Sequence, residues 1–151
     1  MTTTAPTATP PSLADTADHT ADQAAIEELI AGVAAGIEAR DPDVCVARFA
    51  ADARSVIATG RRGVGRDAIR QAHVAAFASG TIPGTPRFAL LDLVFVRPDV
   101  AIATTGAYPA APGEPGEPID LDAPPTVVTW TLVRQDDGWW VAARQFTRVA
   151  A

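Results

Sequence analysis

The chain has 151 residues, of which 48% are hydrophobic, and its 12 basic against 18 acidic side chains leave a formal charge of −6. This length fits one domain with a sizeable core, and the acidic balance excludes a nucleic-acid binder because phosphate recognition needs a positive face. A single cysteine excludes an internal disulfide, and no apolar run approaches the roughly 18 residues of a membrane-spanning helix, so no membrane partner is expected.

The first residues, 1–19, are rich in Thr, Pro and Ala and poor in large apolar side chains. Such a segment buries too little surface to offset the entropy of ordering, so we expect a disordered tail. It also lacks the basic start and apolar stretch of a secretory signal, which favours a cytoplasmic location. Residues 20–151 are then expected to form one single domain.

Three helices are predicted at the start of this domain. Apolar residues recur at helical spacing over 26–37, and Pro42 stops that helix because the residue before a proline avoids helical backbone angles. Asp41 can cap a second, short helix that begins at Pro42. A third helix is predicted over 66–79 and ends at Gly80.

The rest of the chain alternates between β-rich runs and turns. Strands are predicted at 54–59, 88–96, 100–108, 126–134 and 139–149. A proline-rich, acidic loop interrupts them at 109–125. Helices first and a meander of long strands afterwards indicate an α+β fold. Several strands are apolar on both sides, so we expect the second sheet face to be covered by another copy of the chain, as a homodimer.

The order of these elements, together with several motifs, resembles the nuclear transport factor 2-like superfamily. DPDVCVARFAADARSV (41–56) is similar to that family's second helix and first strand, and GRRGVGRDAIRQAH (60–73) to the entry to its third helix. FVRPDVAIA (95–103) and WVAARQFTRV (140–149) resemble the SgcJ/EcaC group of SnoaL-like proteins, which is associated with enediyne and other polyketide pathways. The resemblance implies a cone-shaped, curved mixed or antiparallel sheet, three helices over its concave face, and an apolar cavity between them.

The resemblance implies a protein that binds a hydrophobic intermediate of natural-product biosynthesis. It could also process that small molecule by cofactor-free acid–base chemistry, as an isomerase, a cyclase or a hydrolase-like enzyme. The alternative is a non-catalytic dimeric module that assembles or chaperones a polyketide synthase. Phe146 favours this alternative, because it stands where the family pattern has Asn. No flavin, nicotinamide, haem or metal motif is present, so neither a cofactor nor a metal is expected.

Two residues are candidates for moving a proton. His73 shares a face of its predicted helix with apolar residues that would turn it toward the sheet, where it could act as a catalytic group or as a core histidine bonded to a backbone carbonyl. Asp92 interrupts an apolar strand. Facing inward it would have a raised pKa, as suits a general base, whereas facing outward it would pair with an Arg.

Five further residues are candidate ligand contacts: Tyr108, Thr129, Trp130, Gln145 and Thr147. The two aromatic rings would line the cavity or serve as packing, and the three polar side chains would orient a carbonyl group. In a regular alternation Gln145 and Thr147 share a face with Val141. The alternative is that they form hydrogen bonds between neighbouring strands and contact no ligand. The same alternation places Arg144 and Phe146 on the opposite face, at a dimer interface or an exposed surface.

Overall fold

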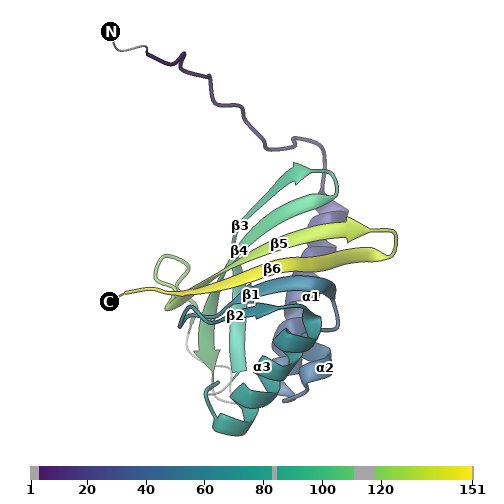
Figure 1. The fold of residues 1–151 in the computed structure, drawn as a ribbon, viewed down its shortest axis with the longest axis vertical. Coiled ribbons are helices and arrows are strands. Elements are labelled where there is room, and N and C mark those ends of the chain that lie inside the picture. Colours follow the sequence, from purple (N-terminus) through teal and green to yellow (C-terminus); the bar gives the residue numbers. More distant parts are fainter. Residues whose placement is uncertain (1–3, 83–84, 111–117, 151) are drawn as a thin grey trace.

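The computed structural model describes residues 4–82, 85–110 and 118–150 (Figure 1). In chain order its elements are α1 (Thr20–Glu38), α2 (Pro42–Cys45), β1 (Phe49–Val56), β2 (Arg62–Val64), α3 (Arg66–Ser79), β3 (Thr85–Arg97), β4 (Val100–Ala110), β5 (Thr126–Gln135) and β6 (Gly138–Arg148). The expected α+β class is confirmed. Of the predicted loop at 109–125, residues 111–117 lie outside the described residues, and 118–125 contain no helix or strand.

The six strands form one curled sheet in the order β2-β1-β6-β5-β4-β3, and α1 and α3 pack against it (Figure 1). The pairs from β3 to β6 are antiparallel, whereas β1 lies parallel to β6, so the sheet is mixed as expected. α1 lies along β3, and α3 lies against β1. We call the space between the sheet and these helices the concave interior. None of the helices in the described ranges is long and apolar enough to cross a membrane.

The largest differences from the sequence prediction concern β1 and β2. The first strand begins at Phe49 rather than at residue 54, because Phe49 is completely buried and the strand starts where the chain enters the core. The glycine-rich segment 60–65, expected to be only a turn, contains β2, which pairs with the end of β1. The third helix ends as predicted, at a Gly80 whose φ is +68°, a left-handed conformation that suits glycine.

The last residues before α1 contact the edge of the sheet. The Asp15 backbone N–H donates to the Phe95 carbonyl at 2.6 Å, and the His19 ring stacks on the Phe95 ring with centroids 4.0 Å apart. The segment before these residues has no helix or strand and extends away from the domain (Figure 1). The end of the predicted tail is therefore docked on β3.

α1 and α2 approach each other closely at Gly36. A Cβ atom placed on this glycine would lie 2.6 Å from the backbone nitrogen of Cys45, a distance that side-chain carbons do not tolerate. Gly36 and Cys45 are both buried. The absence of a side chain at Gly36 thus sets how near α2 lies to α1, and Cys45 is held inside the core as a result.

The alternation of side chains along β6 changes phase at one β-bulge. Val141 pairs with Leu132, and Ala143 with the preceding residue of β5, so Ala142 is an extra residue on β6. Val141 and Arg144 therefore both face the concave interior, although they are three residues apart. The regular alternation expected for this strand was wrong, because one extra residue moves every later side chain to the other face.

Candidate functional site

One row of side chains crosses the concave face of the sheet from β3 to β1. Each of its residues pairs with the next across neighbouring strands, and we call them the inner row: Leu93, Ala103, Trp130, Arg144 and Ser55. Arg144 and Ser55 are its polar members, and their exposed fractions are only 3% and 5%. From α3, His73 adds a third buried polar side chain, with 7% exposed. With Thr105 on β4, the buried and largely apolar interior encloses four polar side chains able to form hydrogen bonds.

Arg144 is a buried cation surrounded by aromatic rings. Its guanidinium carbon lies 4.8 Å from the ring centres of Phe49 and Phe146, and 5.7 Å from that of Trp130. Burial lowers the pKa of Arg144 to about 10, so the group is still charged at neutral pH. Within the described part of the chain, its Nε and Nη1 atoms have no hydrogen-bond partner. Cation–π attraction therefore offsets only part of the cost of burying this charge.

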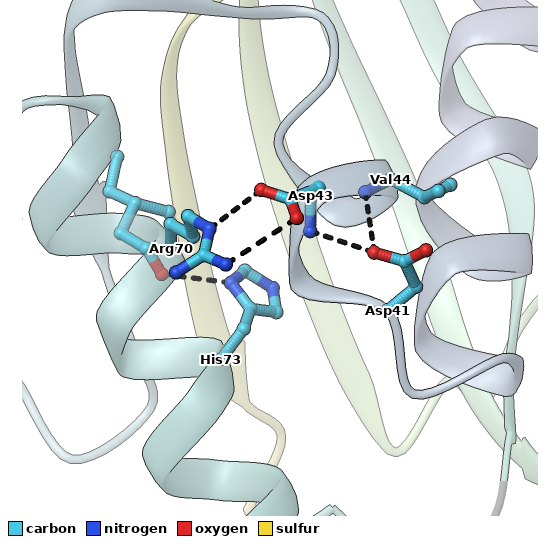
Figure 2. Close-up of polar contacts among 6 residues, drawn as sticks. Asp41, Asp43, Val44, Arg70 and His73 are labelled. Carbon is cyan, nitrogen blue, oxygen red and sulfur yellow. Dashed lines mark hydrogen bonds and ion pairs between the residues drawn. The ribbon is translucent and has the colours of Figure 1, made fainter.

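His73 is a neutral base directed by its own helix. Its Nδ1 lies 2.9 Å from the Ile69 carbonyl oxygen (Figure 2), and because a carbonyl can only accept, Nδ1 carries the proton and Nε2 carries the lone pair. Burial, and next the charge of Arg144, lower the pKa of His73 to about 4, against a smaller opposing effect of the hydrogen bond. Both alternatives left open by the sequence are therefore compatible with this residue: it bonds a backbone carbonyl and still offers Nε2.

The helix that carries His73 is tied to α2 by surface contacts. The Asp41 carboxylate caps α2 by accepting from the backbone N–H groups of Asp43 and Val44 at 3.0 and 3.3 Å, as predicted (Figure 2). The Arg70 guanidinium on α3 then donates to the Asp43 carboxylate at 2.7 Å and holds the pKa of Asp43 below its ordinary value. This exposed pair lies about one helical turn from His73. It orients α3 against α2, but as an exposed ion pair it contributes little to the free energy of unfolding.

A hollow of about 450 Å³ opens between α1 and the start of β3. The residues around it come from α1, β3 and β4: Glu27, Ile30, Ala31, Ala34, Ala35, Glu38, Pro86, Arg87, Phe88, Leu90 and Thr105. Its volume lies within the range of about 300–1,000 Å³ that small-molecule sites occupy. Alanines on the helix side and Phe88 and Leu90 on the sheet side make its wall largely apolar.

The hollow borders the inner row through Trp130. The Trp130 indole N–H donates to the Thr105 hydroxyl at 3.1 Å, and the Phe88 ring meets Trp130 edge-on at 5.5 Å. Thr105 and Phe88 both line the hollow. Because the Thr105 oxygen accepts this bond, its own hydrogen is left to donate to a bound molecule. The hollow thus offers a largely apolar wall with one buried hydroxyl, and Trp130 contacts both this wall and Arg144.

Cys45 adds no nucleophile to this interior. Burial raises the pKa of its thiol to about 11, and the nearby Arg144 charge only partly opposes that rise. The neutral thiol that results is unreactive at physiological pH. In the described ranges no group of three or more His, Cys, Asp or Glu side chains could hold a metal ion. The described interior offers hydrogen-bonding groups and one neutral base, His73.

The structure separates the seven sequence-predicted site residues into two groups. His73 and Trp130 lie in the concave interior. The others lie on the opposite face of the sheet: Asp92, Tyr108, Thr129, Gln145 and Thr147. Four of these five are exposed. The fifth, Tyr108, is covered because its ring folds over Gly106 and its hydroxyl donates to the Asp120 carbonyl at 2.8 Å.

The outward positions have physical causes. The bulge at Ala142 turns Gln145 and Thr147 outward, and it turns Arg144 inward. On β3 a register shift between Leu90 and Asp92 likewise leaves Asp92 exposed, which is the outward alternative of the two considered. Asp92, Gln145 and Thr147 therefore do not line the concave interior, and their role as site residues stays a prediction.

Three polar residues of the interior were missed by sequence reasoning: Ser55, Thr105 and Arg144. Thr105 follows Ala101 and Ala103 at the two-residue spacing of one strand face, and this signal could have placed it inside. For Arg144 the regular alternation predicted an outward position, and its inward position depends on the bulge. Ser55 lies inside the strand predicted at 54–59, and its inward position follows only from the pairing of β1 with β6.

Several solved structures share this architecture at low sequence identity. A domain of unknown function with a cystatin-like fold from Nostoc punctiforme is 19% identical, with a TM-score of 0.74 over 87% of this chain and 80% of that chain. Two proteins of Novosphingobium aromaticivorans are also similar. One, named as a candidate scytalone dehydratase, is 17% identical, with a TM-score of 0.62 over 86% and 85% of the two chains. The other, named as a candidate aromatic ring hydroxylase, is 18% identical, with a TM-score of 0.59 over 87% and 91%.

These likenesses establish the nuclear transport factor 2-like, cystatin-like fold and nothing finer. No curated protein sequence matches the chain significantly. The family model of the SnoaL-like domain matches residues 18–145, which include α3 with His73 and β6 up to the residue after Arg144. The chain therefore belongs to the SnoaL-like domain family.

Proposed function

We propose that this protein binds a hydrophobic small molecule in its concave interior, as part of a cytoplasmic polyketide or enediyne-type biosynthesis. The observation that carries the proposal is the hollow of about 450 Å³, whose largely apolar wall includes the buried Thr105 and contacts Trp130 of the inner row. Such a site, mostly apolar with a few polar groups, is typical of small-molecule binding. Two similar structures carry enzyme names, a dehydratase and a ring hydroxylase, which supports a small organic substrate.

The same interior supports cofactor-free proton transfer. His73 is neutral, and its Nε2 carries the lone pair, so it can accept a proton from an activated carbon and return it elsewhere on the same molecule. The negative charge that develops on the substrate oxygen would be stabilised by the buried Arg144. This division of roles fits an isomerase or a cyclase, with His73 as the catalytic base and Trp130 as a ring contact.

Native mass spectrometry of the protein purified from a host that expresses a polyketide synthase tests this proposal. We expect a stoichiometric hydrophobic adduct on the wild type. Ala34→Trp, which fills the hollow from α1, should lose the adduct. Ala24→Trp, an exposed position on the same helix, should keep it. A wild type without adduct, together with a hollow that binds no aromatic probe, would overturn the proposal.

The alternative, a non-catalytic dimeric module for a synthase, is favoured by one observation. Phe146 lies half-buried against Arg144 and fills interior space where the family pattern has a smaller amide. We also propose that the chain forms a homodimer through the outer sheet face, where Val94, Ile102 and Val133 are only partly buried. Thr129→Arg places a charge on that face and should convert the dimer to a monomer in analytical ultracentrifugation, whereas Arg134→Lys should not.

A further inference from the structure

We infer that Arg144 is the anchor for an oxyanion, and that the ligand of the concave interior is a flat, conjugated molecule bearing a carboxylate or an enolate-type oxygen. The inference rests on the proposed function, because it assumes that the interior binds a small molecule. It goes further by naming the charge, shape and binding group of that molecule.

The first step is that Arg144 has no anionic partner among the residues that the structure describes. Among the described residues the ion pairs of arginine join Arg48, Arg70 and Arg134 to aspartates near the surface. Arg144 is more buried than any of these and forms none. A charged group taken out of water without a partner destabilises the protein, so a protein that keeps one gains from a ligand that neutralises it.

The second step concerns the N–H groups of Arg144. The rings of Phe49, Trp130 and Phe146 attract the positive charge, but a ring offers no oxygen atom to an N–H donor. Nε and Nη1 are both buried and, in the ranges that the structure describes, have no acceptor. Hydrogen bonds from a guanidinium to an oxyanion are among the strongest in proteins. An oxyanion would therefore supply both the missing acceptor and the missing charge.

The third step is that one further donor lies beside Arg144, and another lies on the far side of Trp130. Ser55 pairs in register with Arg144 on the neighbouring strand, and its buried hydroxyl also has no partner among the described residues. Thr105 has a hydrogen left to donate, one strand beyond Trp130. Hydroxyl donors in addition to a cation favour a negatively charged oxygen over a neutral one. The surrounding rings favour a flat conjugated skeleton that can stack on them.

The fourth step links this anchor to His73. The charge of Arg144 is one of the causes that lower the pKa of His73, after burial. An oxyanion bound at Arg144 would offset that charge and so raise the pKa of His73, while the larger lowering caused by burial would persist. Binding of a substrate would thus make His73 a stronger base.

The test compares two probes of the same shape, 2-naphthoate and its neutral analogue 2-naphthamide. Binding is measured by calorimetry and by quenching of tryptophan fluorescence, because Trp130 faces Arg144. The wild type should bind the carboxylate at least about tenfold more tightly than the amide, as expected for a charge-assisted hydrogen bond. Arg144→Met should lose this preference and keep the affinity for the amide. Arg148→Met, an exposed arginine on the same strand, should change neither.

The outcomes separate the inference from the proposed function. If the wild type binds both probes equally, the oxyanion anchor is wrong although the binding site stands. If neither probe binds, the small-molecule function itself fails. If Arg144→Met weakens both probes alike and lowers the melting temperature, Arg144 is a packing residue, since removing an unpaired buried charge should leave the empty protein as stable or more stable.

Two further measurements complete the design. If Arg144→Met does not fold, the carboxylate preference of the wild type, which needs no variant, decides the inference. Arg144→Lys should then keep part of that preference, because it retains the charge. 2,4-Dinitrophenolate, a flat anion whose charge lies on a ring oxygen, distinguishes the two oxyanion sources: tighter binding than 2-naphthoate indicates an enolate-type ligand, and weaker binding a carboxylate.

Discussion

The two faces of the sheet differ most clearly where β5 and β6 pair. On the inner face Trp130 lies opposite Arg144, and on the outer face the preceding and following residues, Thr129 and Gln145, lie opposite each other. The outer pair is polar, uncharged and exposed, whereas the inner pair is buried and includes a charge. Exposed polar side chains are common and carry little information, but a buried cation is rare and needs a reason. The inner face is therefore where function should be sought.

Shortening a buried side chain of the inner face should have the largest effect on the free energy of unfolding. Trp130→Ala removes a fully buried ring and its hydrogen bond to Thr105, and should lower the free energy of unfolding by about 3–5 kcal/mol. Thr129→Ala, one residue away on the exposed face, should change it by less than about 0.5 kcal/mol. Urea denaturation of both variants measures the difference, and similar midpoints for the two would contradict the assignment of faces.

The pH dependence of stability should come in part from the inner face. The pKa of His73 is about 4 in the folded protein against 6.5 for the ordinary residue. Below pH 6.5 the unfolded chain binds a proton that the folded chain refuses, so stability falls as the pH drops toward 4. The full effect is about 3 kcal/mol, of which about 2 kcal/mol should be lost between pH 7 and pH 5.

His73→Gln is the matched variant for this effect. Urea titrations at both pH values should show that the variant loses about 2 kcal/mol less than the wild type over this interval. Its carboxylates are the same as in the wild type, so the difference between the two proteins isolates the histidine. Equal losses in the two proteins would mean that His73 is solvated and cannot be the neutral base proposed above.

Two glycines of α1 should respond oppositely to substitution, because one lies close to α2 and the other has open space around it. Gly36→Ala puts a methyl group against the backbone of Cys45 and should cost about 1–3 kcal/mol. Gly32→Ala meets no atom within 4 Å and should stabilise the helix by roughly 0.5–1 kcal/mol. Thermal unfolding of the pair gives the sign of each change. A stabilised Gly36→Ala would show that α1 and α2 are less closely packed than described.

The sequence was sufficient for the fold and insufficient for the site, and β6 shows why. Periodicity places α3 over 66–79 and His73 on its buried side, because helix faces depend only on local spacing. Strand faces depend on register, and the single extra residue at Ala142 reverses every assignment from Ala143 onward. The bulge arises from pairing with β5, which no local pattern around Ala142 reveals. Trp130, on the unbulged partner strand, is one of the two predicted site residues found inside.

The smallest expected effects belong to the outer face. Gln145→Ala and Thr147→Ala remove exposed polar groups, and each should change the free energy of unfolding by less than about 0.5 kcal/mol. Neither should alter the affinity for 2-naphthoate, because the side chains point away from Arg144 and the hollow. Calorimetry on the two variants checks this directly. A tenfold loss of affinity in Gln145→Ala would place the ligand on the outer face, where a second copy of the chain could close a site, and would remove the reason for reading function from Arg144.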